Sequence, residues 1–379
     1  MKYLISGGGT GGHLFPAMAI AEQLRRRDPD ADILFVGSNG KIEMTKVPAA
    51  GYRIVGLPID RGFRRGEILS NVGLLWKVPV SLWQAWRAVR EFCPDIAIGV
   101  GGYASLAALK VAQWMGVPTL LQEQNSFAGV TNKMLAGKAL KVCVAYEGMA
   151  RFFPSDRIVL TGNPVRQTLL ECDATPDEAR RQLGLQPGVP TILVVGGSLG
   201  ARTVNNAMIK GLEYLAGESD VQVLWQTGKK YLRDEAIAAM ERVKPANVVR
   251  ADFIDRMDLA YRAANVVVSR AGASSISELQ LLGKAAILVP ATFVAEDHQR
   301  HNAMALVNKD AAVFVHDDDS KHTGGEPTAS EVLPHEMVAL VHDTERVATL
   351  ERNIREMALP DAAAVIADEI DRLTHSNGK

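Results

Sequence analysis

Short apolar runs alternate with amphipathic segments along the first part of the chain. The apolar runs predict strands at 2–6, 32–36, 53–57, 96–100, 119–122, 141–145 and 157–161. Helical patterns fall between them, for example at 18–27 and 105–115. Strands that are apolar along their whole length and are separated by helices are typical of a parallel sheet covered on both faces. The pattern therefore predicts an α/β fold.

The same alternation begins again after residue 190. Further strands are predicted at 191–195, 222–225, 248–251, 266–269, 286–289 and 312–315. A polar helix and a Gln-Pro-Gly turn separate the two series, so the domain boundary is expected within 162–190. We expect two Rossmann-like domains, 1–163 and 164–359, that face each other across a cleft. The helical pattern near the C-terminus predicts that a last helix, from about residue 360, packs back on the first domain.

The composition is that of a soluble globular protein, because 47% of the 379 residues are hydrophobic and 22% are charged. The 42 basic and 43 acidic residues nearly cancel, so no overall field would attract nucleic acid. Cys93 and Cys143 lie in or beside apolar runs and are expected to be buried thiols in a reducing compartment. Without a signal peptide or a long apolar window, the protein is expected to be intracellular.

Each series of strands opens with a glycine-rich loop after its first strand. Residues 7–16 read GGGTGGHLFP, and residues 196–202 read GGSLGAR. The first loop has the spacing of the dinucleotide fingerprint, but the second strand ends Phe-Val-Gly-Ser, without the carboxylate that an NAD ribose requires. We therefore expect the amides of both loops to approach another anionic group, a diphosphate for the second. Ordinary turns without a ligand are the alternative.

Three polar side chains near these loops are candidates for chemistry. Histidine has a reference pKa of about 6.5, near cellular pH, so His13 is a candidate general base, although a capping or packing role is the alternative. The Ser198 hydroxyl could donate to a diphosphate, or it could simply cap a helix. Arg166, close to the expected hinge, could reach a phosphate, or it could be surface charge.

Two later segments are dense in small and polar residues at the ends of predicted strands. Residues 269–278 read SRAGASSISE, where Glu278 could accept hydrogen bonds from a ribose diol or cap a helix. Residues 290–303 read PATFVAEDHQRHNA, where Gln299 suits sugar hydroxyls, whereas no metal spacing is recognised. A polar loop at 317–331 begins with three aspartates, which we expect to be solvated and to bind no metal.

The segment 68–92 combines three tryptophans with basic neighbours. Tryptophans beside lysine and arginine suit a membrane interface, whereas the alternative is a helix buried on the sheet. Both interpretations hold if only one face of the helix is buried.

The motifs, in their order along nearly the whole chain, resemble the bacterial MurG family. The resemblance rests on GGGTGGHLFP, GGSLGAR and five further segments: VGGYAS (100–105), EQNSFAGVTNK (123–133), GNPVR (162–166), RAGASSISE (270–278) and EDHQRHNA (296–303). Two positions depart from the family pattern. Leu199 replaces a glutamine, and Gln122 stands where some relatives have histidine.

The resemblance implies a GT-B glycosyltransferase that moves N-acetylglucosamine, with inversion, from UDP-N-acetylglucosamine to the muramyl sugar of lipid I, giving lipid II. His13 would be the base, and no metal or other cofactor is expected. The first domain would face the acceptor and the membrane, and the second would bind the UDP-sugar. By motif, the donor contacts would be Thr10, Gly11, Gly12, Asn125, Arg166, Ser198, the backbone of Ile254, Ala273, Ser274, Ser275, Ile276, Ser277, Glu278 at the ribose, and Gln299 at sugar hydroxyls.

A lipid-linked acceptor gives the tryptophan-rich segment a function. Leu75, Trp76, Val80 and Trp83 are expected to contact anionic lipid at the cytoplasmic face of the inner membrane. Two alternatives for the activity stay open at this point. One is another GT-B transferase with a lipid acceptor, such as a diacylglycerol glycosyltransferase, and the other is an enzyme similar to the UDP-N-acetylglucosamine epimerases.

Overall fold

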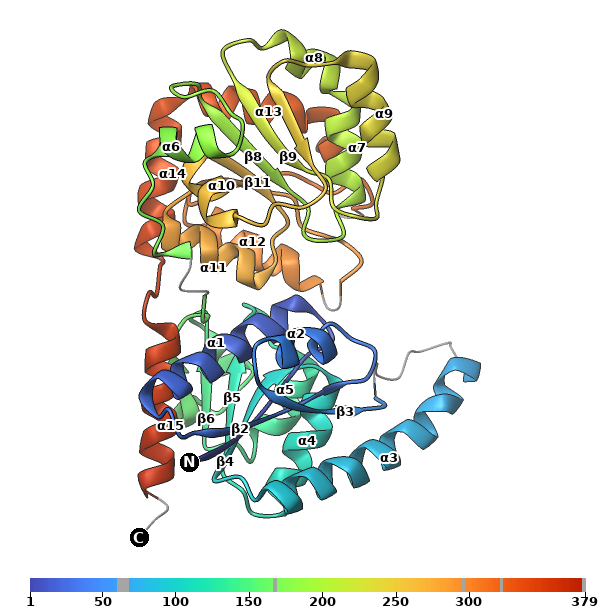
Figure 1. Cartoon of the computed structure of the whole chain (residues 1–379), viewed down its shortest axis with the longest axis vertical. Coiled ribbons are helices and arrows are strands. Elements are labelled where there is room, and N and C mark those ends of the chain that lie inside the picture. Colours follow the sequence, from blue (N-terminus) through green and yellow to red (C-terminus); the bar gives the residue numbers. More distant parts are fainter. Residues whose placement is uncertain (60–67, 166–168, 295–296, 321–322, 377–379) are drawn as a thin grey trace. The chain divides into compact units, whose positions relative to one another are not determined.

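The computed structural model describes residues 1–59, 68–165, 169–294, 297–320 and 323–376. The chain divides into two units, here called unit 1 (Met1–Arg166 with Leu359–Lys379) and unit 2 (Gln167–Ala358). Unit 1 extends a little beyond residue 163, and its C-terminal part begins at Leu359. Figure 1 shows both units.

Within the described residues, unit 1 is built on a parallel sheet in the order β3-β2-β1-β4-β5-β6-β7. The predicted α/β class is therefore confirmed. The strands are β1 (Lys2–Gly7), β2 (Asp32–Ser38), β3 (Arg53–Leu57), β4 (Ile96–Gly101), β5 (Thr119–Glu123), β6 (Lys141–Val144) and β7 (Ile158–Leu160).

Helices cover both faces of this sheet because its strands are apolar on both sides. Leu4 of β1 packs in one core with α3, α4 and α5, whereas its neighbours Tyr3 and Ile5 pack in a second core with α1, α2 and α15. The helices are α1 (Gly11–Arg27), α2 (Glu43–Ala49), α3 (Ile68–Phe92), α4 (Tyr103–Trp114), α5 (Val130–Ala136) and α15 (Ala362–Ser376), with two short 3₁₀ turns, η1 (Met149–Arg151) and η2 (Ser155–Arg157).

The C-terminal helix α15 lies against α1, as Figure 1 shows. Ile366 and Ile370 are fully buried in the core that they share with α1. Arg27 at the end of α1 forms ion pairs with Asp368 at 2.7 Å and Asp371 at 2.9 Å. Apolar burial and these pairs together hold the end of the chain on unit 1.

Unit 2 repeats the architecture with a second parallel sheet, in the order β10-β9-β8-β11-β12-β13 among the described residues. The strands are β8 (Thr191–Val195), β9 (Gln222–Gln226), β10 (Val248–Ala251), β11 (Val266–Ser269), β12 (Ala285–Leu288) and β13 (Val313–Phe314). The helices are α6 (Pro176–Gln182), α7 (Arg202–Lys210), α8 (Leu212–Gly217), α9 (Arg233–Val243), α10 (Met257–Ala263), α11 (Ala273–Leu282), α12 (His298–Val307), α13 (Ala329–His342) and α14 (Thr344–Glu356).

The core of unit 2 lies between its sheet and the helices α7, α8, α9 and α13. Trp225 of β9 is fully buried there, and its indole nitrogen donates to Asn205 Oδ1 of α7 at 3.1 Å. On the rest of the unit, α10 contacts α6 and β8, and α14 contacts α11 and β12. The repeated strand–helix alternation of the sequence thus forms two layered units, each with a parallel sheet covered by helices.

Two local predictions from the sequence were wrong. Asp317, expected in a solvated loop, is buried, where its carboxylate pairs with Arg270 and accepts a hydrogen bond from Thr203 Oγ1 at 2.8 Å. Its partner Arg270 lies 47 residues away in the sequence, so the local pattern gave no sign of the pair. Cys93, expected to be buried, is exposed at the turn after α3, whereas Cys143 of β6 is buried as expected.

Candidate active site

The carboxyl ends of β1, β4 and β5 lie side by side in unit 1, because β4 pairs with both of the other strands. Three segments leave the sheet there: the glycine loop after β1, Gly101 and Gly102 after β4, and Gln124 and Asn125 after β5. Ligands of open α/β sheets bind at this edge. The structure therefore brings His13, Thr10 and Asn125, predicted separately from the sequence, to one edge of unit 1.

A buried carboxylate holds the first glycine loop in place. Glu43, at the start of α2, accepts hydrogen bonds at Oε1 from the amides of Gly9 at 2.9 Å and Ser38 at 3.0 Å. A side chain at Gly8 would overlap this carboxylate, which explains the glycine there. The amide of Gly9 thus has a protein partner, and the amides of the following helical turn remain as candidates for a ligand.

Glu43 is a residue that the sequence analysis missed. It lies five residues beyond the end of β2 and folds back to Ser38, so an acidic side chain does lie at the end of the second strand. Because its Oε1 is engaged by two backbone amides, the carboxylate supports the loop. The signal in the sequence was a single acid at the start of a short helix.

His13 lies in the first turn of α1 and is half-buried. Its Nδ1 lies 3.0 Å from Gln124 Oε1. Gly101 has a φ of +102°, and a Cβ there would lie 2.9 Å from the imidazole Cε1. Glycine at position 101 is therefore required both by its backbone conformation and by the closeness of the ring.

The start of α1 has the properties of an anion site. Thr10 is the exposed N-cap residue, and within the described structure its side chain makes no capping hydrogen bond. Gly11 and Gly12 form the first helical positions. Amides of an uncapped first turn point along the helix axis and favour negative charge.

Asn125 is held by a second buried carboxylate. Glu123, at the end of β5, accepts at Oε1 from the backbone and side-chain nitrogens of Asn125, at 3.1 and 3.2 Å. Its Oε2 accepts from Gly129 N and Asn132 Nδ2, both at 3.0 Å. Four hydrogen bonds to one buried carboxylate give this loop a defined shape.

In unit 2, the carboxyl ends of β8, β11 and β12 are adjacent because β11 pairs with both neighbours. Ser198 lies exposed in the loop between β8 and α7, and α7 begins without a side-chain cap in the described structure. Gln226, at the end of β9, joins this loop to a second one. Its Nε2 donates to Gly197 O at 3.1 Å, and its Oε1 accepts from Ile254 N at 2.9 Å. Because the Ile254 amide already donates to Gln226, a nucleotide base could contact the backbone of Ile254 only through its carbonyl oxygen.

Helix α11 carries the small and polar residues predicted around the nucleoside. Ala273, Ile276 and Ser277 are buried, and Ser277 Oγ donates to Ala273 O at 3.0 Å. Ser274 and Ser275 are half-buried, and Ser274 Oγ is a buried hydroxyl with no hydrogen-bond partner among the described residues. An unsatisfied buried hydroxyl is costly to the folded state.

Glu278, in the second turn of α11, is oriented by a residue that the sequence analysis missed. Tyr261 of α10, almost fully buried, donates its hydroxyl to Glu278 Oε2 at 2.9 Å. Gln299 of α12 lies near the exit of β12, where its Oε1 accepts from Ala291 N at 2.9 Å. Arg166, the predicted phosphate contact, lies outside the described residues.

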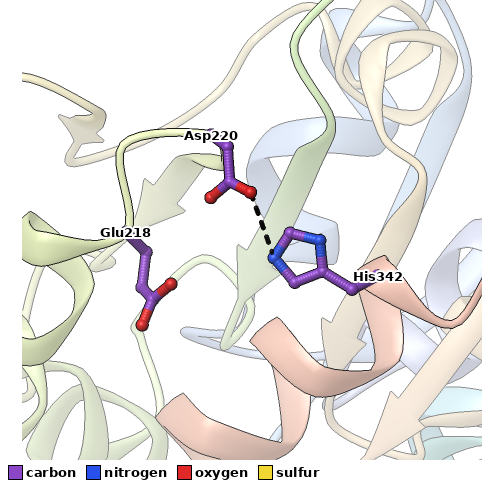
Figure 2. Close-up of side chains that lie close together, drawn as sticks. All are labelled: Glu218, Asp220 and His342. Atoms are coloured by element: carbon purple, nitrogen blue, oxygen red, sulfur yellow. Dashed lines mark ion pairs between the residues drawn. The ribbon is translucent and has the colours of Figure 1, made fainter.

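One group of described side chains places three possible metal ligands near one another: Glu218, Asp220 and His342 (Figure 2). The ligand atoms lie within 4.8 Å of one another, and Asp220 Oδ2 lies 3.8 Å from His342 Nε2. Asp220 precedes β9 and therefore lies at the amino edge of the sheet, opposite to the edge that carries Ser198 and Glu278. The group is not part of the candidate active site.

Comparison with known proteins gives the chain its family. The model of the glycosyltransferase family 28 N-terminal domain matches residues 3–144, and that of the family 28 C-terminal domain matches residues 191–364. A Parabacteroides distasonis protein is 54% identical over 98% of this chain and 98% of its own length, and a Bacteroides fragilis protein is 50% identical over 100% of this chain and 97% of its own. Both are named UDP-N-acetylglucosamine--N-acetylmuramyl-(pentapeptide) pyrophosphoryl-undecaprenol N-acetylglucosamine transferase.

The crystal structure of Acinetobacter baumannii MurG resembles this fold with a TM-score of 0.74 and 26% identity, covering 98% of this chain and 100% of that one. The chain belongs to the MurG family. The MurG resemblance expected from the ordered motifs is thus confirmed. Both carboxyl-edge regions described above lie mostly within the two family 28 domain matches.

Proposed function

We propose that this member of the MurG family transfers N-acetylglucosamine from UDP-N-acetylglucosamine to the muramyl sugar of lipid I and so forms lipid II. The observation that carries the proposal is the 54% identity, over almost the full length of both chains, to a relative named for this reaction. The geometry supports the proposal because the carboxyl edge of each sheet carries groups that suit one part of the reaction. Unit 1 carries a histidine in a fixed orientation, and unit 2 carries the groups suited to a nucleotide sugar.

The donor would be held mainly by unit 2. The amides at the start of α7 and the Ser198 hydroxyl would bind the diphosphate, aided by Arg166. Glu278, held by Tyr261, would accept hydrogen bonds from the ribose hydroxyls. The carbonyl of Ile254 would accept from the uracil, and Gln299 would contact sugar hydroxyls.

The α11 segment would complete the donor site. Its small residues would let the nucleoside and the sugar approach the backbone, and the hydroxyls of Ser274 and Ser275 would contact the ligand. From unit 1, the first turn of α1 (Thr10, Gly11 and Gly12) and Asn125 would contact the sugar or the diphosphate.

The reaction would proceed as a single displacement with inversion. The acceptor hydroxyl oxygen forms a bond to the anomeric carbon of N-acetylglucosamine, and the bond from that carbon to the diphosphate oxygen breaks. The electron pair of the broken bond leaves with UDP, and His13 takes the proton of the attacking hydroxyl. Helix-terminal amides and an arginine would stabilise the charge that develops on UDP.

We propose that unit 1 also contacts the membrane that carries the acceptor. On α3, Leu75, Trp76, Val80 and Trp83 are exposed, with 78% of Trp76 and 57% of Trp83 accessible to solvent. The opposite side of the helix is buried against the sheet. None of the described helices is both long and apolar enough to cross a bilayer.

The exposed stripe on α3 suits the interfacial layer of a bilayer, where the amphipathic indole ring is stable. Arg87 and Arg90 lie exposed toward the end of the same helix and would favour anionic lipid. We therefore propose that the protein is peripheral and acts at the cytoplasmic face of the inner membrane. No nucleic-acid partner is proposed, because basic and acidic residues balance.

The decisive experiment is transfer of labelled N-acetylglucosamine from UDP to a short-chain lipid I analogue. We expect a labelled lipid product and release of UDP that depends on the acceptor. Release of UDP without any acceptor would instead favour an epimerase-like or hydrolytic enzyme. Labelled product formed on diacylglycerol and not on the lipid I analogue would favour the other lipid glycosyltransferases.

A further inference from the structure

We propose that Gln124 is a positioning residue that fixes the tautomer of His13, with the proton on Nδ1 and the basic lone pair on Nε2. This inference rests on the proposed function, in which His13 accepts the proton of the acceptor hydroxyl. It adds a residue whose role is to keep the imidazole in the form that can act as a base.

The orientation of the Gln124 amide follows from its surroundings. Gln124 is almost fully buried, and its side-chain nitrogen lies 2.8 Å from the carbonyl oxygen of Val100 and 3.1 Å from that of Gln122. Backbone carbonyls can only accept, so the amide must present its NH₂ group to them. Its oxygen must then face His13, whose Nδ1 lies 3.0 Å away.

The side-chain amides of Asn163 and Gln122 independently require the same orientation of the Gln124 amide. Asn163 Nδ2 donates to the carbonyl oxygen of Gln124 at 3.0 Å, so Asn163 Oδ1 must accept from Gln122 Nε2 at 2.8 Å. The oxygen of Gln122 is then directed at the nitrogen of Gln124, with which it forms a hydrogen bond. Because Gln122 and Asn163 are also buried, reversing any one amide would leave several buried groups mismatched.

The consequence for His13 is a matter of hydrogen-bond chemistry. An amide oxygen can only accept, so Nδ1 must carry a hydrogen, and the neutral ring then has its lone pair on Nε2. When Nε2 takes a proton, the Nδ1 hydrogen bond is kept. The amide chain therefore supports both the neutral and the protonated ring, and the imidazole need not reorient during the reaction.

The first test reads the tautomer without measuring activity. We would record the ¹⁵N resonances of histidine-labelled protein at alkaline pH and assign His13 by their loss in His13→Gln. The expected result is a protonated Nδ1 and an unprotonated Nε2. A protonated Nε2 with an unprotonated Nδ1 would overturn the proposal. Since no substrate is present, this result is independent of whether the transferase reaction is the true activity.

The second test is a double-mutant cycle with Gln124→Met, which keeps the size of the side chain and removes the amide. We expect kcat to fall on the order of 10²-fold, within the loss of up to about 10⁴-fold that a wrong histidine tautomer can cause. In a His13→Ala background the same change should have almost no further effect on kcat, because the proposed effect of Gln124 on the reaction is transmitted through His13. An equal loss in both backgrounds would overturn the proposal.

The pH profile separates positioning from structural damage. A hydrogen bond from Nδ1 to an oxygen stabilises the imidazolium form more than the neutral form. Gln124→Met should therefore move the acidic limb of the kcat/KM profile to lower pH, whereas damage to the fold would lower the rate without moving the limb. An unmoved limb would count against the proposal.

Gln113→Met is the matched control for these experiments. Gln113 also donates from a half-buried amide in unit 1, to Thr119 Oγ1 at 3.2 Å and Leu135 O at 3.0 Å, but at the amino edge of the sheet. It should leave kcat and the pH profile unchanged. If the wild-type protein transfers no sugar, the proposed function fails while the tautomer result still decides the role of Gln124.

Discussion

The carboxylate of Glu43 accepts the amide hydrogen of Gly9 at 2.9 Å, across 34 residues of sequence. The same oxygen accepts from Ser38 at the end of β2, so one buried side chain joins the first glycine loop to the neighbouring strand. A side chain at Gly8 would overlap the carboxylate. The shape of the glycine run is therefore set in part by a side chain of the protein itself.

Replacement of Glu43 should separate its hydrogen-bonding role from its charge. Glu43→Ala removes the acceptor of two amides and should lower the free energy of unfolding by about 1–3 kcal/mol, the cost of an unsatisfied buried Ser38 amide, because Gly9 is exposed and its amide can bond to water. Glu43→Gln keeps an acceptor oxygen and should cost clearly less. Urea denaturation of both variants measures the difference. Equal losses would show that the hydrogen bonds to Gly9 and Ser38 are not what stabilises the loop.

Loss of the imidazole should slow the chemical step. His13→Ala should lower kcat on the order of 10²–10⁴-fold, the range for a general base. The affinity for UDP, measured by calorimetry, should hardly change, because the groups proposed to bind UDP belong mainly to unit 2 and the His13 imidazole is not among them. A His13→Ala protein that turns over at the wild-type rate would end the assignment of His13 as the base.

Removal of the Tyr261 hydroxyl should weaken binding of the donor, because this hydroxyl orients Glu278. Tyr261→Phe deletes the hydrogen bond to Glu278 Oε2 and should raise KM for the UDP-sugar about 2- to 10-fold, since a hydrogen bond contributes about 0.5–1.5 kcal/mol. kcat should change little.

Tyr146→Phe is the control for Tyr261→Phe, because the Tyr146 hydroxyl is also buried but has no hydrogen-bond partner in the described part of the chain. Equal donor KM values for the two variants would contradict the proposed role of Tyr261.

Serine at two tryptophan positions should weaken membrane binding. Trp76→Ser with Trp83→Ser removes two exposed indoles from α3 and should reduce flotation with vesicles that contain anionic lipid. Phe293→Ser is the control, since Phe293 is 81% exposed in unit 2. Transfer to a water-soluble acceptor should persist in the double variant. Unchanged flotation of the double variant would argue against α3 as the contact.

Lys284 should make stability depend on pH in the alkaline range. Burial lowers the pKa of Lys284 from 10.5 to about 8, while its Nζ donates to Ala264 O at 2.8 Å. Between these two pKa values the unfolded chain binds a proton that the folded chain does not, so the contribution of Lys284 to stability rises with pH. The contribution of Lys284 to the free energy of unfolding should therefore be least favourable at neutral pH.

The Lys284→Gln variant isolates this contribution. The free energy of unfolding of the wild type minus that of Lys284→Gln should rise by up to about 3 kcal/mol between about pH 7 and 10, because one pKa unit corresponds to about 1.4 kcal/mol. Denaturation at several pH values measures the difference. A difference that stays constant or falls with pH would contradict the lowered pKa.

The sequence alone determined the elements and their class. Strands in parallel sheets that are covered on both faces must be apolar along their length, so β1, β4 and β8 stand out as short apolar runs, and the helices between them show their own period. Glycine loops directly after β1 and β8 indicated where ligands would approach. His13 and Ser198 were predicted from these loops, and Glu278 was predicted from the small and polar segment that follows β11.

Only the tertiary structure decided which distant side chains support those residues. Gln124 contacts His13, Tyr261 donates a hydrogen bond to Glu278, and Glu43 accepts one from Gly9. In each case, strand order or helix packing brings together segments that are distant in the sequence. Asp317 became buried for the same reason, since its partner Arg270 arrives from another strand end. The spacing of apolar residues in a short segment indicates whether it forms a helix or a strand. The contacts named here depend instead on the order in which the strands pair, and no short stretch of sequence specifies that order.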